Sequence, residues 1–291
     1  MQKSDSYSPV IAGTMTWGQW GKQLPKVEMT RLMHHCLEMG ITTFDHADIY
    51  GGYTNEADFG SSFVDSGISR QHIQLITKCG IQYVCEARDN TVKHYDYSTD
   101  YIIRSAERSL KNLQTDYIDL FLLHRPSPLM HPDAIAEAVV QLKKTGKIKD
   151  FGVSNFTPSQ IALLETRTPV VAHQFEFSLK ARAVFNDGTL DDCLAHGRMA
   201  MAWSPLGSYF QAGNEQTKRL RPIMENLAEK YNATPDQLLL AWIMKHPAGV
   251  HPVVGTTNQK RLKTAMDAIA IRWGLEDWFM LLEAAQGHKV P

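Results

Sequence analysis

An acid and a tyrosine follow the short apolar run Thr42–Phe44 at a spacing that suits proton transfer. Asp45 comes directly after this predicted strand, and Tyr50 lies five residues later, on the loop that precedes the next predicted helix. Tyrosine can donate a proton, but its unperturbed pKa of about 10 is too high for easy transfer at neutral pH. Nearby positive charge favours the phenolate. The pattern therefore predicts a cation beside Tyr50, supplied from elsewhere in the chain.

Strand, loop and helix alternate about eight times without a linker rich in Pro, Gly or Ser. The predicted strands end near residues 13, 45, 78, 124, 154, 174, 203 and 255. This repetition is typical of parallel βαβ units, and eight of them favour a closed barrel over an open doubly wound sheet. No G-x-G-x-x-G motif follows an early strand, which counts against a Rossmann fold. We predict a single α/β domain over residues 1–291, an (α/β)8 TIM barrel.

Apolar spacing and capping residues predict the helices between these strands. The main expected helices cover residues 27–40, 54–64, 99–113, 133–144, 190–196, 221–232 and 235–246, with a short one opened by Pro158 and two more at the C-terminal end. Ser98 or Thr99 is expected to cap the third of them. Residues 80–98 show no clear periodicity and form a candidate substrate loop.

In such a barrel the C-terminal ends of all strands meet around one mouth. Asp45, Tyr50, Lys78 and His124 then come together, although up to 79 positions separate them in the sequence. Lys78, near the end of the third strand, is the cation that Tyr50 needs.

The composition excludes several other classes of protein. Lys and Arg number 30 against 31 Asp and Glu, without long runs of one sign, so we expect neither a nucleic-acid nor a membrane surface. No apolar stretch approaches the roughly 18 residues of a spanning helix, and the N-terminus shows no signal pattern. The four cysteines form no C-x-x-C pair, and no metal-ligand spacing is present, so we expect a reduced, cytoplasmic protein without a metal.

The arrangement of these residues resembles the catalytic tetrad of the aldo-keto reductase family. The similarity runs from about Gly13 to about Ala265. Its motifs are Asp45-x4-Tyr50-Gly51, Lys78, His124-Arg125-Pro126, Gly152-Val153-Ser154-Asn155-Phe156 and Trp203-Ser204-Pro205-Leu206-Gly207. This resemblance implies a barrel that reduces aldehydes or ketones with a nicotinamide cofactor, usually NADPH.

The resemblance also implies a role for each of the four residues. Tyr50 would be the general acid that protonates the carbonyl oxygen, and Lys78 would lower its pKa. Asp45 would keep Lys78 charged and in place, and His124 would orient the carbonyl by a hydrogen bond. These roles suit hydride transfer, because negative charge grows on the carbonyl oxygen and placed donors stabilise it.

For the cofactor, the resemblance implies that Ser154, Asn155 and Gln174 hold the nicotinamide carboxamide and that Trp203 stacks on the ring. Arg261 would contact the 2′-phosphate of NADPH, which suits guanidinium chemistry. The other implied cofactor contacts are Gly13, Thr14, Asp45, Ser204, Leu206, Gly207, Gly255, Thr256 and Thr257.

The chain departs from the family pattern at three positions. Gly255 stands where many relatives have lysine, so the preference for NADPH should rest largely on Arg261. Ser127 occupies a position that is often Asp, and Met15 one that is often Trp, which leaves the substrate class open. Five aromatic residues could line the substrate site or simply pack: Trp17, Trp20, Tyr53, Tyr95 and Tyr97.

Two other functions remain open from the sequence. Some family members act as regulatory subunits of ion channels, and this chain could bind cofactor with little turnover. A phosphate-sugar lyase or isomerase barrel also uses lysine at a strand end, but it would not account for Tyr50 with Asp45. We expect a small-molecule carbonyl substrate and a monomer or weak homo-oligomer.

Overall fold

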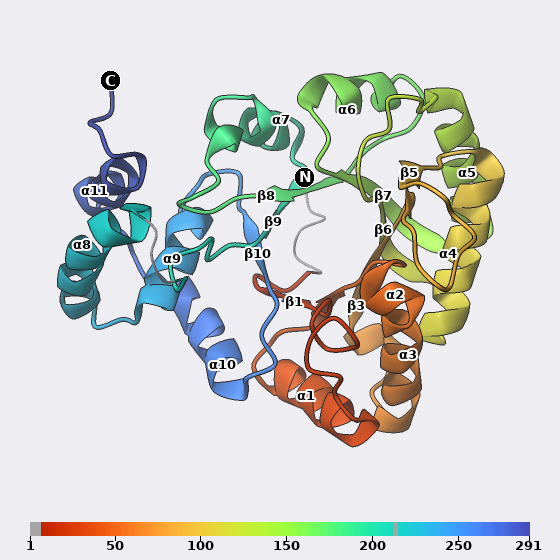
Figure 1. The fold of residues 1–291 in the computed structure, drawn as a ribbon, viewed down its shortest axis with the longest axis horizontal. Coiled ribbons are helices and arrows are strands. Elements are labelled where there is room, and N and C mark those ends of the chain that lie inside the picture. The colour runs from red at the N-terminus through yellow and green to blue at the C-terminus, as the bar shows by residue number, and fades with distance from the viewer. Residues whose placement is uncertain (1–6, 212–214) are drawn as a thin grey trace.

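The computed structural model describes residues 7–211 and 215–291, and their eight parallel strands close into a barrel in the order β1-β10-β9-β8-β7-β6-β3-β2 (Figure 1). The barrel strands are β1 (Ile11–Gly13), β2 (Thr43–Asp45), β3 (Gln74–Cys79), β6 (Ile118–Leu123), β7 (Ile148–Ser154), β8 (Ala172–Glu176), β9 (Met199–Trp203) and β10 (His251–Val254). The predicted (α/β)8 fold in one domain is confirmed.

Helices surround this ring on its outside (Figure 1). They are α1 (Lys26–Glu38), α2 (Tyr50–Tyr53), α3 (Asn55–Ser66), α4 (Thr99–Leu113), α5 (Pro132–Lys144), α6 (Pro158–Glu165), α7 (Thr189–His196), α8 (Glu215–Tyr231), α9 (Pro235–Met244), α10 (Gln259–Asp267) and α11 (Leu275–Gln286). Local sequence fixes several of their ends. The Ser98 side chain accepts a hydrogen bond from the backbone N–H of Tyr101 at the start of α4, and Thr157 and Gln160 form a capping box on α6.

The structure differs from the sequence prediction in two segments. Residues 80–98 contain a small antiparallel pair, β4 (Ile81–Gln82) with β5 (His94–Tyr95), which is too short to show a period. Helix α8 begins at Glu215, six residues before its predicted start, and carries Pro222 in its interior. Pro222 is the eighth residue of the helix, beyond the first four N–H groups that lack a partner within it, so it removes one helical hydrogen bond. Sequence reasoning treats such a proline as a boundary, which explains the late predicted start.

Both faces of each barrel strand are largely buried, one inside the barrel and the other against the helices. Alternate residues point into the barrel, where Ile11, Ile76, Leu120, Leu122 and Met201 pack together. The residues between them face the helices, and burial on both sides explains why these strands are almost continuously apolar. The interior is therefore filled below the mouth, and the polar residues of interest gather at the C-terminal strand ends. No helix in the described part of the chain is long and apolar enough to cross a lipid bilayer.

Candidate active site

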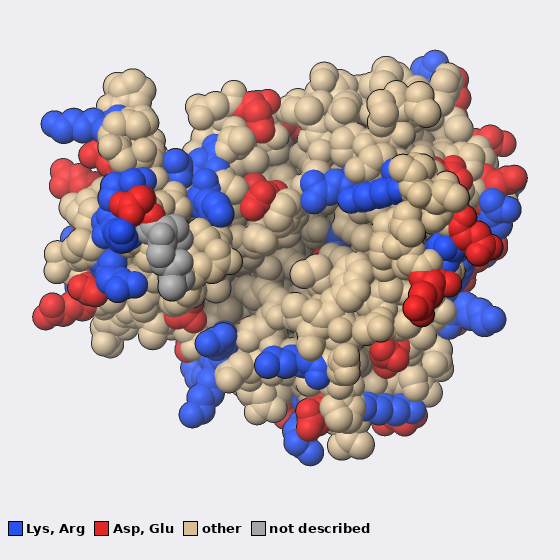
Figure 2. All heavy atoms as spheres, viewed as in Figure 1, with Lys and Arg blue, Asp and Glu red and all other residues tan. Residues whose placement is uncertain are grey.

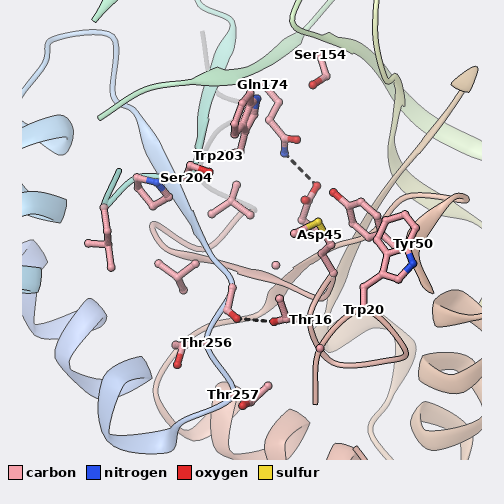
Figure 3. Close-up of a pocket in the computed structure, with 18 of the residues that line it drawn as sticks. Thr16, Trp20, Asp45, Tyr50, Ser154, Gln174, Trp203, Ser204, Thr256 and Thr257 are labelled. Atoms are coloured by element: carbon pink, nitrogen blue, oxygen red, sulfur yellow. Dashed lines mark hydrogen bonds between the residues drawn. The ribbon is translucent and has the colours of Figure 1, made fainter. Parts of the chain in front are cut away.

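A cavity of about 1260 Å³ opens at the C-terminal ends of the strands. Figure 2 shows the hollow in the middle of this face, with Lys and Arg side chains at several points around its edge. Its lining comes from the ends of all eight barrel strands or the segments that follow them, and Lys78 of β3 lies buried behind it. Figure 3 shows Asp45 beside Tyr50, with the Gln174 amide hydrogen-bonded to Asp45 and Trp203 next to Gln174. This is the position that the barrel fold predicts for a functional site.

Strand periodicity explains why Lys78 points toward Asp45. On β3, Ile76 faces the barrel interior, so Lys78, two residues later, faces the same way. Lys78 is fully buried, and its Nζ lies 2.7 and 2.8 Å from the two carboxylate oxygens of Asp45. It also donates to the His46 carbonyl at 2.7 Å and to the Tyr50 hydroxyl at 3.4 Å. The cation expected beside Tyr50 is thus present and bound in place.

The pKa of Tyr50 is raised, whereas the sequence predicted that Lys78 would lower it. Burial raises this pKa, and although Lys78 lowers it, burial outweighs the lysine while Asp45 also raises it. The geometry explains the balance, because Lys78 is closer to the Asp45 carboxylate than to the phenol oxygen. The same ion pair and Tyr50 raise the pKa of Lys78 although burial opposes its charge. Tyr50 is therefore protonated at neutral pH.

His124 lies directly after β6 and faces Tyr50. Because Leu122 points into the barrel, the same alternation turns the His124 side chain toward the mouth. Its ring centroid is 6.1 Å from that of Tyr50, with the two planes at 79°. Burial first, and then Lys78 and Arg125, hold the pKa of His124 well below its ordinary value. The imidazole is therefore neutral, and it can donate only one N–H to a bound molecule.

A set of amide and hydroxyl groups lines the adjoining wall of the cavity. The Asn155 amide donates to the Ser154 hydroxyl at 2.7 Å and accepts from the Trp203 indole N–H at 2.9 Å. Gln174 donates to Asp45 Oδ1 at 3.0 Å. Asn155 adopts a left-handed backbone with φ 62°, and so does Ser204 with φ 51°. Such conformations are costly for residues with side chains and cluster at functional sites.

The far side of the cavity is formed after β9 and β10. Leu206 and Gly207 line it, and a Cβ on Gly207 would come within 2.9 Å of the Ser178 hydroxyl. We call the group Gly255, Thr256, Thr257 and Arg261 the β10 end, and Asp45, Tyr50, Lys78 and His124 the tyrosine end. Arg261 is exposed in the first turn of α10, and its backbone N–H donates to the Asn258 side chain. All four residues of the β10 end line the cavity.

Two of the predicted site residues do not line the cavity. Lys78 lies behind it, in contact with Asp45 and Tyr50. Thr14 is fully buried, and its hydroxyl lies 2.8 Å from the His46 ring and donates to the Asp45 carbonyl. Its structural position is therefore support for the strand that carries Asp45. Gly13 does line the cavity, beside Met15.

Of the five aromatic residues left open by the sequence, only Trp20 lines the cavity. Its ring centroid lies 6.2 Å from that of Tyr50. Trp17 is fully buried among other rings, and the Tyr97 hydroxyl bonds to the backbone of Arg125. Packing thus accounts for most of these aromatics.

Sequence reasoning missed two buried acids behind the tyrosine end. Burial raises the pKa of Asp48 to about 8, and neighbouring Glu56 adds to the shift. Burial likewise raises the pKa of Glu56, whose carboxylate accepts a 2.6 Å hydrogen bond from Thr77. The Asp48 carboxylate accepts hydrogen bonds from Ser105 and Tyr101, and Asp45 is the carboxylate paired with Lys78. The sequence holds little to indicate this, because acids two and six residues from a tyrosine are ordinary on a polar loop.

Two cations beside the tyrosine end were also missed. Arg125 and Lys93 both line the cavity, and both lower the pKa of His124. Arg125 follows His124 directly, so the signal was its position in the His124-Arg125-Pro126 motif. Lys93 lies in the segment 80–98 that we expected to approach the substrate, together with Ile81.

The sequence matches a known protein family over nearly its whole length. The model of the Aldo/keto reductase family matches residues 9–284. The chain belongs to the aldo/keto reductase family. An oxidoreductase of Bacillus subtilis named YcsN, itself uncharacterized, is 40% identical over 98% of this chain and 96% of its own length.

Further relatives and solved structures show the same relationship. A 6-dehydroglucose reductase of Agrobacterium fabrum is 38% identical over 88% of this chain and 86% of its own length. The thermostable aldo-keto reductase Tm1743, solved with the inhibitor epalrestat, superimposes with a TM-score of 0.78 at 28% identity, covering 95% of this chain and 94% of that one. A glycerol dehydrogenase of Gluconobacter oxydans has a TM-score of 0.85 at 23% identity, covering 97% and 92%, and this likeness concerns the fold alone. As an aldo/keto reductase, the protein is an oxidoreductase of a family that uses nicotinamide cofactors.

Proposed function

We propose that this aldo/keto reductase reduces aldehydes or ketones to alcohols with NADPH, using Tyr50 as the general acid. The single observation that carries the proposal is the buried Lys78, which is hydrogen-bonded to both Asp45 and Tyr50 at the floor of the cavity. A buried lysine needs a charged partner, and here the pair also contacts a phenol that faces open space. This arrangement suits carbonyl reduction, in which a placed proton donor meets the charge that grows on the carbonyl oxygen.

The chain supplies the proton and the orientation for this reaction. The cofactor supplies a hydride to the carbonyl carbon when it is bound. The carbonyl oxygen then gains negative charge, which the Tyr50 hydroxyl neutralises by giving up its proton. The charge left on the phenol is stabilised by Lys78, 3.4 Å away. Neutral His124 donates one hydrogen bond to the carbonyl oxygen and fixes its direction toward Tyr50.

The residues lining the cavity fit a nicotinamide dinucleotide. Ser154, Asn155 and Gln174 present hydroxyl and amide groups that suit a carboxamide, beside the flat ring of Trp203. The cavity volume of about 1260 Å³ exceeds the ~300–1000 Å³ of an ordinary small-ligand pocket. Residues that follow β9 and β10 continue this wall: Ser204, Leu206, Gly207, Gly255, Thr256 and Thr257.

Arg261 supports NADPH over NADH as the cofactor. Its guanidinium lies at the β10 end, where a 2′-phosphate would find two threonine hydroxyls nearby. A guanidinium can bind phosphate with paired hydrogen bonds. We further propose a small-molecule carbonyl substrate, a cytoplasmic location, and a monomer or weak homo-oligomer; no observation favours the channel-subunit interpretation.

The decisive experiment follows the nicotinamide absorbance with a panel of aldehydes and ketones, using wild type and Tyr50→Phe with NADPH and with NADH. Tyr50→Phe should keep cofactor affinity and lose roughly 10²–10⁴-fold of the reduction rate, because the ring still packs while the proton donor is gone. A Tyr50→Phe enzyme that retains more than half of the wild-type kcat would contradict the assignment.

A further inference from the structure

The tyrosine end of the cavity carries positive charge that neither the proposed reaction nor the proposed cofactor site uses. Four cations line the cavity, namely Lys22, Lys93, Arg125 and Arg261, against two acids, Asp45 and Asp236. Asp45 is already paired with Lys78. Among the described residues, no carboxylate lies within ion-pair distance of Arg125 or Lys93. The surroundings of the carbonyl are therefore cationic.

Contacts hold both the backbone and the guanidinium of Arg125 in place. The buried Tyr97 hydroxyl donates to the Arg125 carbonyl and accepts from its N–H at 3.2 Å, which fixes the backbone. The guanidinium carbon lies 5.5 Å from the centre of the Trp203 ring, which supports the head group from one side. A cation–π contact leaves the positive charge and the N–H donors available. Such a preorganised arginine binds an anion without losing much side-chain entropy.

The order of the strands places Arg125 far from the cofactor's phosphate contacts. Arg125 follows β6, and Arg261 follows β10, and three strands separate β6 from β10 in either direction around the barrel. Arg261 at the β10 end therefore lies on the opposite side of the mouth. Arg125 instead acts on both His124 and Tyr50, because it lowers the pKa of each. A cation there faces the substrate.

We infer that Arg125, assisted by Lys93 at the rim, forms a subsite for a negatively charged group on the carbonyl substrate. The inference rests on the proposed function and names its substrate class: aldehydes or ketones that also carry a carboxylate or a phosphate. The carbonyl oxygen lies at Tyr50 and His124, and the anion is bound by the guanidinium of the next residue. Lys93 is exposed and raises the local positive potential, which favours the approach of anions.

A matched pair of aldehydes tests the subsite. 4-Carboxybenzaldehyde and methyl 4-formylbenzoate share the ring and the carbonyl but differ in charge. With wild type and NADPH, kcat/KM should be about tenfold to a hundredfold higher for the carboxylate, the range for a hydrogen bond to an ionised group. This ratio should fall as salt is added. 4-Formylphenyl phosphate, compared with the carboxylate, shows which anion the subsite prefers.

Variants at Arg125 show whether that residue is responsible. Arg125→Gln should reduce the carboxylate-to-ester ratio by at least tenfold, and Arg125→Lys should retain part of it. The ratio is the proper measure, because Arg125 also influences Tyr50 and His124 and those effects apply to both aldehydes. Arg104→Gln removes an exposed arginine of α4 outside the cavity and should leave the ratio unchanged. An ester reduced as well as the carboxylate, or a ratio insensitive to Arg125→Gln, overturns the inference.

The two proposals fail in different ways. If neither neutral nor anionic carbonyls are reduced with either cofactor, the proposed function is wrong. Calorimetric binding of 4-(hydroxymethyl)benzoate and of its methyl ester then decides the subsite separately. Tighter binding of the carboxylate, lost in Arg125→Gln, supports the subsite, whereas equal affinities for the two compounds contradict it.

Discussion

The tyrosine end and the β10 end of the cavity differ in how completely their polar groups are already bound by the protein. Lys78 has no exposed surface and contacts Asp45, the His46 carbonyl and Tyr50 at once. Arg261 is exposed, and no carboxylate in the described part of the chain lies within ion-pair distance of it. The end proposed for the chemistry is preorganised, while the β10 end offers groups that a ligand must engage. Substitutions at the two ends should therefore have different consequences.

The largest effect is expected at the buried pair. Lys78→Met leaves Asp45 without its cation, and breaking a buried ion pair costs about 3–5 kcal/mol of unfolding free energy. It should also abolish reduction, and Asp45→Asn should weaken reduction, since Lys78 stabilises the charge that forms on Tyr50. Urea unfolding and the carbonyl assay measure the two effects.

Lys263→Met is the matched control for that stability change. Lys263 pairs with Asp267 on α10, but both side chains are exposed, at 63% and 48%. Exposed pairs are worth about 0–1 kcal/mol, so this variant should unfold nearly as wild type does. Equal losses for Lys78→Met and Lys263→Met would show that the tyrosine end is not the more tightly organised one.

At the β10 end, a substitution should change affinity and leave the fold unchanged. Arg261→Ala should weaken NADPH binding about tenfold to a hundredfold, because a charge-assisted contact to the 2′-phosphate is lost, and should leave NADH nearly unchanged. Fluorescence titration with both cofactors measures this contrast, and Lys260→Ala on the same helix is the control. Equal losses of affinity for NADPH and NADH would show that Arg261 does not contact the 2′-phosphate and is an ordinary surface charge.

A smaller gain is expected from Gly255→Lys. A Cβ at this position meets only the Thr16 hydroxyl, at 3.9 Å, so the chain has room for a side chain. A lysine there should tighten NADPH binding by up to about tenfold while NADH binding stays the same. Gly255→Ala separates the added charge from the loss of glycine. If Gly255→Lys strengthens both cofactors equally, its effect does not come from the 2′-phosphate.

The smallest predicted effect concerns pH. Because burial raises the pKa of Tyr50, the phenol should remain protonated through the alkaline range in which a free tyrosine begins to ionise. Reduction, measured with chemistry rate-limiting, should therefore show no Tyr50-dependent fall below pH 10 or so. Alcohol oxidation, which needs the phenolate, should be slow at neutral pH. A fall near pH 8–9 that disappears in Tyr50→Phe would show that Lys78 outweighs burial.

Much of this molecule was readable from local sequence. Helix α4 begins and ends where the spacing and the Ser98 cap predicted, and the predicted strand ends lie within two residues of the observed ones. Period-two alternation then directs Lys78 toward Asp45 without further information. These features depend on residues near one another in the chain, or on a repeat that only one closed architecture satisfies.

Other features depend on the surroundings that folding creates. The direction of the Tyr50 pKa results from burial competing with Lys78, and neither the depth nor the 3.4 Å separation can be read from the sequence. In the same way, Trp20 lines the cavity while Trp17 packs in the core, although only two residues separate them. The role inferred for the Arg125 guanidinium depends on the strand order, which places it opposite Arg261 around the barrel. Residue types determined which chemistry is possible, and distance, burial and position around the barrel determined what each group can do, because electrostatic effects depend on the medium and on separation in space.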